Sequence, residues 1–306
     1  MRSVVKALMG VLAISLLFLL AGLTAAHLSI RSERPMMPAM EEVLSLKQEE
    51  DRPTRLRWIN TATQHGPDGT IVHSVFVLEW EDGRALLVDT GMDAEAAVAF
   101  GKPMESLLGS DSTIVGRAID EALAGGRERV VGLVFTHMHT DHTQGIEHLC
   151  PPGAGRLDLY MTPAQFERPN YTTGSGLEPV INAPCANRIS LRDEGLARLP
   201  GLEGVGVIRA AGHTPGSQLI VAWVGKDKPR GYVLAGDVVF EFDQIAEDRP
   251  KALVYRVLIT PEADMQLGEV RRWLHVLSRD HGLVVVPSHD FAHIESLGLA
   301  KYSAAE

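Results

Sequence analysis

The sequence THMHTDH, residues 136–142, places four metal-binding side chains on one short loop. It directly follows residues 130–135, a short apolar run rich in β-branched residues, which predicts a buried strand. In extended backbone, residues two positions apart point to the same side. We therefore expect His137 and His139 to converge on one cation. The next two ligand-type residues of the loop then turn toward a second cation.

Three further candidate ligands stand directly after predicted strands. His213 lies in the loop AGHTPGS, which follows an expected strand at residues 204–209. Asp237 follows the apolar run at residues 231–236, and His289 follows the apolar run LVVVP. A carboxylate at the end of an apolar strand is poorly explained by packing. The sequence therefore predicts a metal centre assembled at strand ends.

Together, these positions resemble the His-x-His-x-Asp-His signature and the later ligands of the metallo-β-lactamase superfamily. The resemblance implies an α/β fold, a four-layer αβ/βα sandwich with the metals at one edge. It also implies a ligand set for each ion. One metal takes His137, His139 and His213, the other takes Asp141, His142 and His289, and Asp237 bridges them. The resemblance further implies that Asp89, in an Asp-x-Gly sequence, shapes the loop under the site, although an ordinary turn is an equal interpretation.

The chemistry that this resemblance implies is hydrolysis at a carbonyl group. Two Zn²⁺ ions ~3.5–4 Å apart can hold a hydroxide between them and clamp a carbonyl oxygen. Zinc lowers the pKa of a bound water to about 7, so no side-chain base is needed to form hydroxide. Asp141 is the predicted catalytic residue, because it binds a metal and orients the nucleophile. Iron or another divalent metal is an alternative.

The branch of the superfamily is less sharply indicated. Lactonases and glyoxalase-II-like thioesterases often carry Gly-Gly after the signature, where this chain has Gln144-Gly145, and a His where it has Ser217. The sequence HTPGS is similar to that of some true β-lactamases, but those enzymes do not use the bridging carboxylate that Asp237 provides. We therefore predict a lactone or ester hydrolase. The alternatives are a β-lactamase or thioesterase on the same site and, in another class, a mononuclear iron oxidoreductase resembling persulfide dioxygenases.

The Pro-rich, irregular segment 145–187 is expected to shape the substrate site, as long loops near a site often do. The candidates to line the pocket and hold an acyl tail are Met161, Phe166, Tyr171 and Leu177, with burial in the core as the alternative for each. Cys150 and Cys185 bracket this segment. In an exported protein, two cysteines favour a disulfide.

The N-terminus predicts export. Arg2 and Lys6 precede residues 7–26, an uncharged and Leu-rich stretch. Residues 1–26 are therefore a signal peptide or a membrane anchor of about 20 apolar residues, and both interpretations remain open. In either case we expect the basic residues to stay in the cytoplasm and the rest of the chain to lie in the periplasm or outside the cell.

Composition bounds the remaining expectations. The 306-residue chain is 45% apolar and 22% charged, which is typical of a globular protein. Residues 27–53 predict a solvated linker that is partly helical from Met40 to Gln48. Residues 54–306 predict the metallo-hydrolase domain, with a core-facing helix at residues 112–124. The net charge of -10 argues against a nucleic-acid partner. The expected partner is a small ester or lactone, and the oligomeric state stays open.

Overall fold

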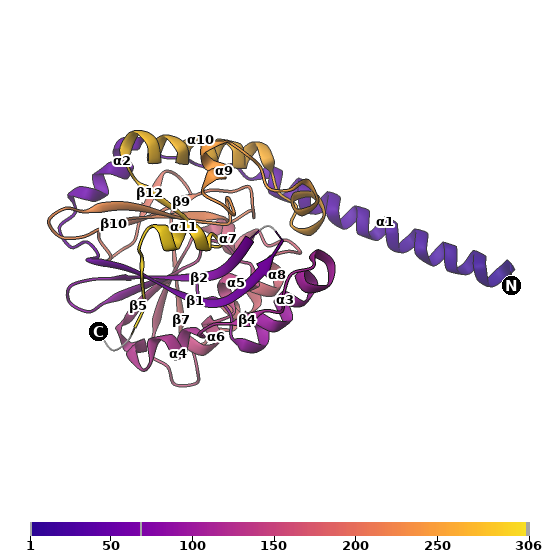
Figure 1. Cartoon of the computed structure of the whole chain (residues 1–306), viewed down its shortest axis with the longest axis horizontal. Helices are drawn as coiled ribbons and strands as arrows, with labels where there is room; N and C mark the ends of the chain where they lie inside the picture. The colour runs from indigo at the N-terminus through magenta and orange to yellow at the C-terminus, as the bar shows by residue number, and fades with distance from the viewer. Residues whose placement is uncertain (1, 68, 304–306) are drawn as a thin grey trace.

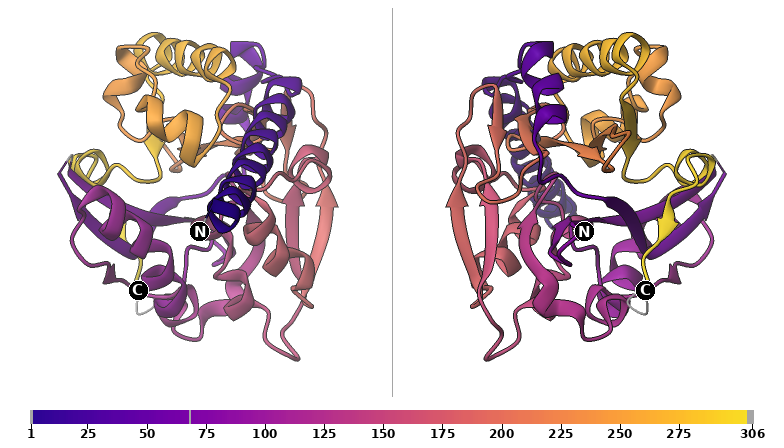
Figure 2. Two further views of the ribbon diagram at one scale, coloured as in Figure 1. Left: turned by 90° about the vertical axis from the view of Figure 1, so that its right-hand side faces the viewer. Right: turned by 90° about the vertical axis from the view of Figure 1, so that its left-hand side faces the viewer.

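The computed structural model describes residues 2–67 and 69–303. Two β-sheets pack face to face, and helices cover the outer face of each sheet (Figure 1). The helix α1 (Arg2–Ser32) projects away from these layers. Figure 2 shows the layers from both ends, with helices of the C-terminal part on one outer side and helices of the N-terminal half on the other.

The first sheet has the strand order β13-β1-β2-β3-β5-β6-β7, and β4 pairs with β1. Neighbours β1, β2 and β3 are antiparallel, whereas β3, β5, β6 and β7 run parallel. The strands are β1 (Arg55–Gly66), β2 (Gly69–Glu79), β3 (Ala85–Val88), β4 (Ile114–Val115), β5 (Val130–Val134), β6 (Leu157–Met161), β7 (Ala186–Ser190) and β13 (Ala300–Lys301).

The second sheet has the order β12-β11-β10-β9-β8 and is antiparallel except for the parallel pair β11 and β12. Its strands are β8 (Leu196–Arg198), β9 (Val205–Arg209), β10 (Gln218–Val224), β11 (Arg230–Gly236) and β12 (Val284–Pro287). Strand β10 is buried along its whole length, which matches its continuous apolar sequence. The carboxyl ends of β9, β11 and β12 meet at one edge of this sheet.

The other helical segments are short, apart from α3 and α10. They are α2 (Met40–Ser45), η1 (Leu46–Gln48), α3 (Ala94–Leu108), α4 (Ile119–Leu123), η2 (Gly126–Arg129), α5 (Thr140–Thr143), α6 (Ile146–Leu149), α7 (Pro163–Glu167), α8 (Gly174–Asn182), α9 (Asp243–Ala246), the π-helix η3 (Tyr255–Ile259), α10 (Asp264–His281) and α11 (Phe291–Ser296).

Three apolar clusters hold the layers together. The central cluster joins the inner faces of the two sheets, for example through Phe76 and Ile220. A second cluster packs the first sheet against α4, α6 and α8, and a third packs the second sheet against α2, α9 and α10. Each sheet is therefore buried on both faces, as a four-layer arrangement requires. The fold is the αβ/βα sandwich that the resemblance implied.

Two local predictions were wrong. The core-facing helix expected at residues 112–124 is only α4, because Ile114 and Val115 form the edge strand β4 and are exposed. The segment expected to be a solvated linker is helical over residues 40–48, as predicted, but this part is not solvated, since Val43 and Leu46 are fully buried against the second sheet. In both cases tertiary packing overrode the local pattern.

The two cysteines form a disulfide. Cys150 follows α6 and Cys185 precedes β7, and their Cα atoms are 5.2 Å apart. The bond closes the irregular segment that contains α7 and α8. It therefore fixes the base of the loops that approach the predicted metal site.

Candidate metal centre

The fold brings all seven predicted ligands to one edge of the sandwich. The signature loop leaves β5, and its second half forms α5. The residues His213, Asp237 and His289 follow β9, β11 and β12, so the second sheet delivers three ligands to the first. Close approach depends on Gly236, which has φ +54°, because a Cβ there would lie 2.7 Å from the Thr136 side chain.

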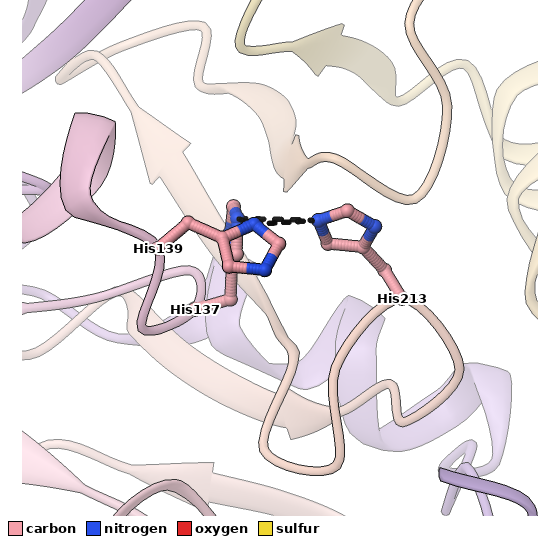
Figure 3. Close-up of side chains that lie close together, drawn as sticks. All are labelled: His137, His139 and His213. Atoms are coloured by element: carbon pink, nitrogen blue, oxygen red, sulfur yellow. Dashed lines mark hydrogen bonds between the residues drawn. The ribbon is translucent and has the colours of Figure 1, made fainter. Parts of the chain in front are cut away.

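Three histidines form what we call the trihistidine group: His137, His139 and His213 (Figure 3). The His137 Nε2 atom lies 3.0 Å from His139 Nδ1 and 3.3 Å from His213 Nε2. The His139 Nδ1 and His213 Nε2 atoms are 3.2 Å apart. The structure therefore brings together the three residues predicted to share one metal.

The other four predicted ligands form the carboxylate group: Asp141, His142, Asp237 and His289. The Asp237 Oδ1 atom lies 3.3 Å from His142 Nε2 and 3.0 Å from His289 Nε2. The Asp141 Oδ2 atom lies 3.4 Å from His142 Nε2 and 3.6 Å from His289 Nε2. Asp237 also reaches toward the trihistidine group, with Oδ2 3.6 Å from His213 Nε2. Its position between the two groups is the one expected of a bridging residue.

The histidines of the trihistidine group are oriented by partners on their outer ring nitrogens. His137 Nδ1 lies 3.1 Å from the Thr136 hydroxyl, and His139 Nε2 lies 3.1 Å from the Thr172 hydroxyl. His213 Nδ1 lies 2.6 Å from Glu262 Oε1. Each contact fixes the ring so that its other nitrogen faces the group.

The same arrangement holds in the carboxylate group. His142 Nδ1 lies 2.8 Å from Asp89 Oδ2, and His289 Nδ1 lies 2.8 Å from the carbonyl oxygen of Val72. Asp89 also accepts hydrogen bonds from the Thr136 backbone N–H and hydroxyl, at 2.7 and 2.8 Å. The contacts of Asp89 fit the loop-shaping role that the resemblance implied. They hold the start of the signature and one of its ligands together.

An ion pair lies behind His213 that the sequence did not reveal. The buried Lys251 donates to Glu262 Oε1 at 2.6 Å, and Lys251 Nζ lies 3.3 Å from His213 Nδ1. Lys251 also donates to the carbonyl oxygen of Asp237. One lysine therefore connects a ligand of the trihistidine group with a ligand of the carboxylate group. In the sequence, Glu262 belongs to no motif and simply follows Pro261, so nothing marked it as a site residue.

His73 is a further residue near the site that the sequence did not mark, because no motif surrounds it. It is buried on β2, and its Nδ1 lies 3.1 Å from Asp141 Oδ2. The ligand atoms of His73, Asp141 and His289 lie within 4.8 Å of one another. The pairing of β2 between β1 and β3 in the first sheet brings His73 to the site.

Burial and local charge set opposite protonation preferences in the two groups. Burial lowers the pKa of His137 well below its usual value and that of His139 to about 3. Burial and the Lys251 charge also lower the pKa of His213. In the carboxylate group, burial opposes the charged forms, but the neighbouring carboxylates raise the pKa of His142 well above its usual value and also raise that of His289.

The ionised carboxylates complete this picture. Burial alone raises a carboxyl pKa, but the charge of His142 holds the pKa of Asp141 well below its usual value. The charges of His289 and His142 do the same for Asp237. Both acids are therefore ionised at neutral pH, as metal ligands must be.

The donor set fits metal ions. Two nitrogens bound to one ion at ~2.0–2.1 Å with tetrahedral angles lie about 3.3–3.4 Å apart, close to the separations in the trihistidine group. Among the described residues, the buried atoms His142 Nε2 and Asp237 Oδ1 have no hydrogen-bond partner, although they face each other. Imidazole and carboxylate donors suit zinc and similar divalent metals.

The expected pocket lining is only partly supported. Met161 and Leu177 are buried in the cluster between the first sheet and its helices, so they cannot line an open pocket. The Arg188 guanidinium lies over the ring of Phe166, with its Cζ atom 3.7 Å from the ring centroid. Tyr171 is exposed and adjoins Thr172, the partner of His139. For Met161 and Leu177 the alternative of burial in the core therefore holds, because the strand β6 and the helix α8 point these side chains into the core.

Comparison with protein-family models gives a match to the metallo-β-lactamase superfamily over residues 68–289. The chain therefore belongs to this superfamily. No curated protein matches the chain in sequence.

Solved structures with a similar fold include an N-acyl homoserine lactone hydrolase with the product N-hexanoyl-L-homoserine at its catalytic metal centre. It is 15% identical, with a TM-score of 0.61, and the match covers 80% of this chain and 96% of the other. A variant of the B. thuringiensis AiiA protein with bound N-decanoyl-L-homoserine is also 15% identical, with a TM-score of 0.60 and the same coverage. The hydrolase AbOPH is 17% identical, with a TM-score of 0.52 over 79% of this chain and 91% of the other. At these identities the similarity establishes the fold.

Proposed function

We propose that the chain is an exported hydrolase that uses two divalent metal ions, such as Zn²⁺, to open lactones or related esters. The observation that carries this proposal is the orientation of five buried histidines. In each ring, one nitrogen is held by a partner outside the site and the other faces Asp141, Asp237 or a neighbouring ring. We assign His137, His139 and His213 to one ion, Asp141, His142 and His289 to the other, and Asp237 to both.

The roles of the protein groups follow from their positions. When bound, the two ions lower the pKa of water at the site and polarise a substrate carbonyl. We propose that the ionised Asp141 accepts a hydrogen bond from the attacking water and holds it toward the carbonyl carbon. As the nucleophile adds to the carbonyl carbon, the same carboxylate takes its proton and passes that proton to the ring oxygen, which leaves as its bond to the carbonyl carbon breaks. Burial of the site excludes bulk water from the other ligands.

A neutral lactone with an acyl tail fits the available information best. The net charge of -10 disfavours polyanionic substrates. A protein of similar fold holds an acyl homoserine product at its metal centre, which supports a lactone as the substrate class here. Tyr171 remains a candidate to contact the acyl chain, because it is exposed beside Thr172.

The test combines metal analysis with a substrate panel. We expect close to two zinc-like ions per chain and the highest kcat/KM for acyl lactones among lactones, aryl esters, a glutathione thioester and a cephalosporin. A thioester or cephalosporin preferred by more than about tenfold, or ~1.4 kcal/mol, would overturn the substrate assignment. One tightly bound iron with oxygen consumption on a persulfide would instead establish the oxidoreductase alternative. Recovery of the native protein from the soluble cytoplasmic fraction would contradict export.

A further inference from the structure

The helix α1 and the surface at its base form one continuous apolar region. Among the described residues, one helix is long and apolar enough to cross a membrane, Val5–Ser32, with a mean hydropathy of 2.4. Its apolar 18-residue window is 0% buried. Figure 1 shows α1 leaving the sandwich beside the orange segment that precedes α10. A direct contact confirms this placement, because His27 Nε2 lies 3.2 Å from the carbonyl oxygen of Val257.

The C-terminal end of α1 is built into the folded domain. Ala26 and Ile30 are buried, and the carbonyl oxygen of Arg31 accepts a hydrogen bond from Gln266 Nε2 at 3.2 Å. The helix runs without interruption through Thr24 and Ala26, the small residues that end the apolar stretch, where a signal peptide would be cleaved. Proteolysis concentrates in exposed, irregular backbone. A packed helix at this point therefore favours a retained anchor over a cleaved signal.

The segment around η3 presents apolar side chains to the outside. Leu253, Val254, Leu258 and Ile259 are between 44% and 64% exposed. The same segment turns Lys251 and Thr260 inward, where both are buried. Single exposed apolar residues are normal, but four within seven positions, beside an apolar helix, mark an interaction surface. Such a surface suits the apolar interior of a lipid bilayer.

Basic residues flank this surface at the level where α1 ends. Arg31 and Arg34 are exposed there. Arginines next to an apolar helix suit anionic lipid headgroups. The apolar segment and the basic flank together match the two regions of a membrane interface.

We propose that residues 253–259 and the base of α1, residues 27–34, form a membrane-docking face, with α1 retained as the anchor. Two aromatic rings connect this face with the metal centre. Tyr255 and Phe240 have ring centroids 4.8 Å apart, and Phe240 lies 5.9 Å from the ring of His289. Resting on the proposed hydrolase function, this placement assigns lipophilic acyl esters or lactones that partition into the bilayer as the preferred substrates.

The docking is tested on the full chain in vesicles of phosphatidylethanolamine and phosphatidylglycerol. A polarity-sensitive fluorophore is attached to a Leu258→Cys variant. The matched control is Lys228→Cys, in the turn between β10 and β11, which lies far from α1 (Figure 1). We expect a blue-shifted emission and quenching by bromolipids for the label at 258 and neither effect at 228. A water-like signal at both positions, or a mature chain that begins at His27, overturns the proposal.

Substrate delivery is tested with the double variant Leu253→Asn and Leu258→Asn, whose side chains contact no proposed ligand. We expect its kcat/KM for a short, water-soluble acyl lactone to stay within about twofold of the unaltered protein, and that for a long-chain lactone in vesicles to fall about tenfold. If the double variant and the unaltered protein have the same kcat/KM for the short lactone and the same kcat/KM for the long-chain lactone, delivery from the membrane is overturned. If no lactone is cleaved by either protein, the hydrolase proposal fails, while the fluorescence result still decides the docking.

Discussion

The trihistidine group and the carboxylate group use similar side chains, but their histidines differ in protonation state. Burial lowers the pKa values of His137, His139 and His213, so these rings are neutral donors. In the carboxylate group, burial is outweighed by nearby carboxylates, so the pKa values of His142 and His289 are raised. The trihistidine group can therefore bind a metal ion without losing a proton, whereas His142 and His289 must release their protons before they bind one.

The supporting contacts differ in the same way. Threonine hydroxyls hold two of the three trihistidine rings, and the charge of the third partner, Glu262, is balanced by Lys251. In the carboxylate group, the partner of His142 is Asp89, which has no lysine or arginine among its described contacts. The predictions below ask whether the two groups behave as separate units.

The largest effect is expected from His139→Ala. The substitution removes one of the three histidine donors of the trihistidine group and leaves the ion there with two histidines and Asp237. We expect kcat/KM to fall by at least about 10²–10³-fold, as for the loss of a principal electrostatic contact in a catalytic site. Elemental analysis should show loss of about one ion per chain. The control His65→Ala changes an exposed histidine on β1 and should leave both values intact. Unchanged turnover in His139→Ala would refute the site assignment.

The next effect tests the ion pair behind His213. In Glu262→Gln, the ring loses a charged acceptor and Lys251 loses its carboxylate partner. We expect metal affinity at the trihistidine group to fall by about 10–100-fold, with a smaller change at the carboxylate group. The titration of the purified variant with zinc and a competing chelator measures both.

A double-mutant cycle separates positioning from folding in this pair. Lys251→Met alone leaves Glu262 buried without its cation, whereas the double variant removes both charges. We therefore expect the double variant to lose less stability than the sum of the two single variants. Additive losses of stability would show that the two side chains act independently.

The pH dependence of the metal-free protein tests the difference in charge directly. His139 has a folded pKa of about 3, so below pH 6.5 the unfolded chain binds a proton there that the folded chain does not. Its contribution to stability is present above pH 6.5 and is lost as the pH falls. At pH 5 the loss is about 2 kcal/mol. His289, with a raised pKa, has the opposite sign: its contribution is full below pH 6.5 and is lost as the pH rises through its folded value.

Urea unfolding at pH 5 and pH 7 measures these contributions. The stability difference between the unaltered protein and His139→Asn should become less favourable to the unaltered protein at pH 5. For His289→Asn the difference should move the other way. The same direction of change in both variants would show that the histidines of the two groups have the same protonation preference.

Much of the fold and of the site was predictable from the sequence, and the exceptions have a common cause. The strand at residues 130–134 and the seven candidate ligands were readable because each candidate stands in a loop after an apolar run, a local relation, and because their order resembles that of the superfamily signature. The exposed edge strand at Ile114 was not predictable. Its pairing with β1 is a contact between distant parts of the chain, which the apolar spacing of a short segment does not show. The burial of Val43 was missed for the same reason. The acidic residues next to it in the sequence indicated a solvated segment, whereas its contacts are with the distant second sheet.

Residues around the ligands were missed because their partners are distant in sequence. Lys251 contacts His213, 38 positions before it, and Glu262, 11 positions after it. His73 precedes Asp141 by 68 positions and meets it through the placement of β2 at the same edge. No periodicity or motif records such contacts. A structure was needed to find them.

The smallest effect concerns His73, which belongs with the carboxylate group by position. Its Nδ1 lies 3.1 Å from Asp141 Oδ2, and its ring lies 4.9 Å from the ring of His289. In His73→Asn, Asp141 loses a partner that orients its carboxylate, as second partners of metal ligands do. We expect about a tenfold loss of affinity for the ion of the carboxylate group and no change for the trihistidine group. Zinc titration that resolves the two affinities measures this, with His65→Asn as the matched control. Equal losses at both groups would mean that His73 supports the fold as a whole, and that the two groups are not the separate units inferred from their charges.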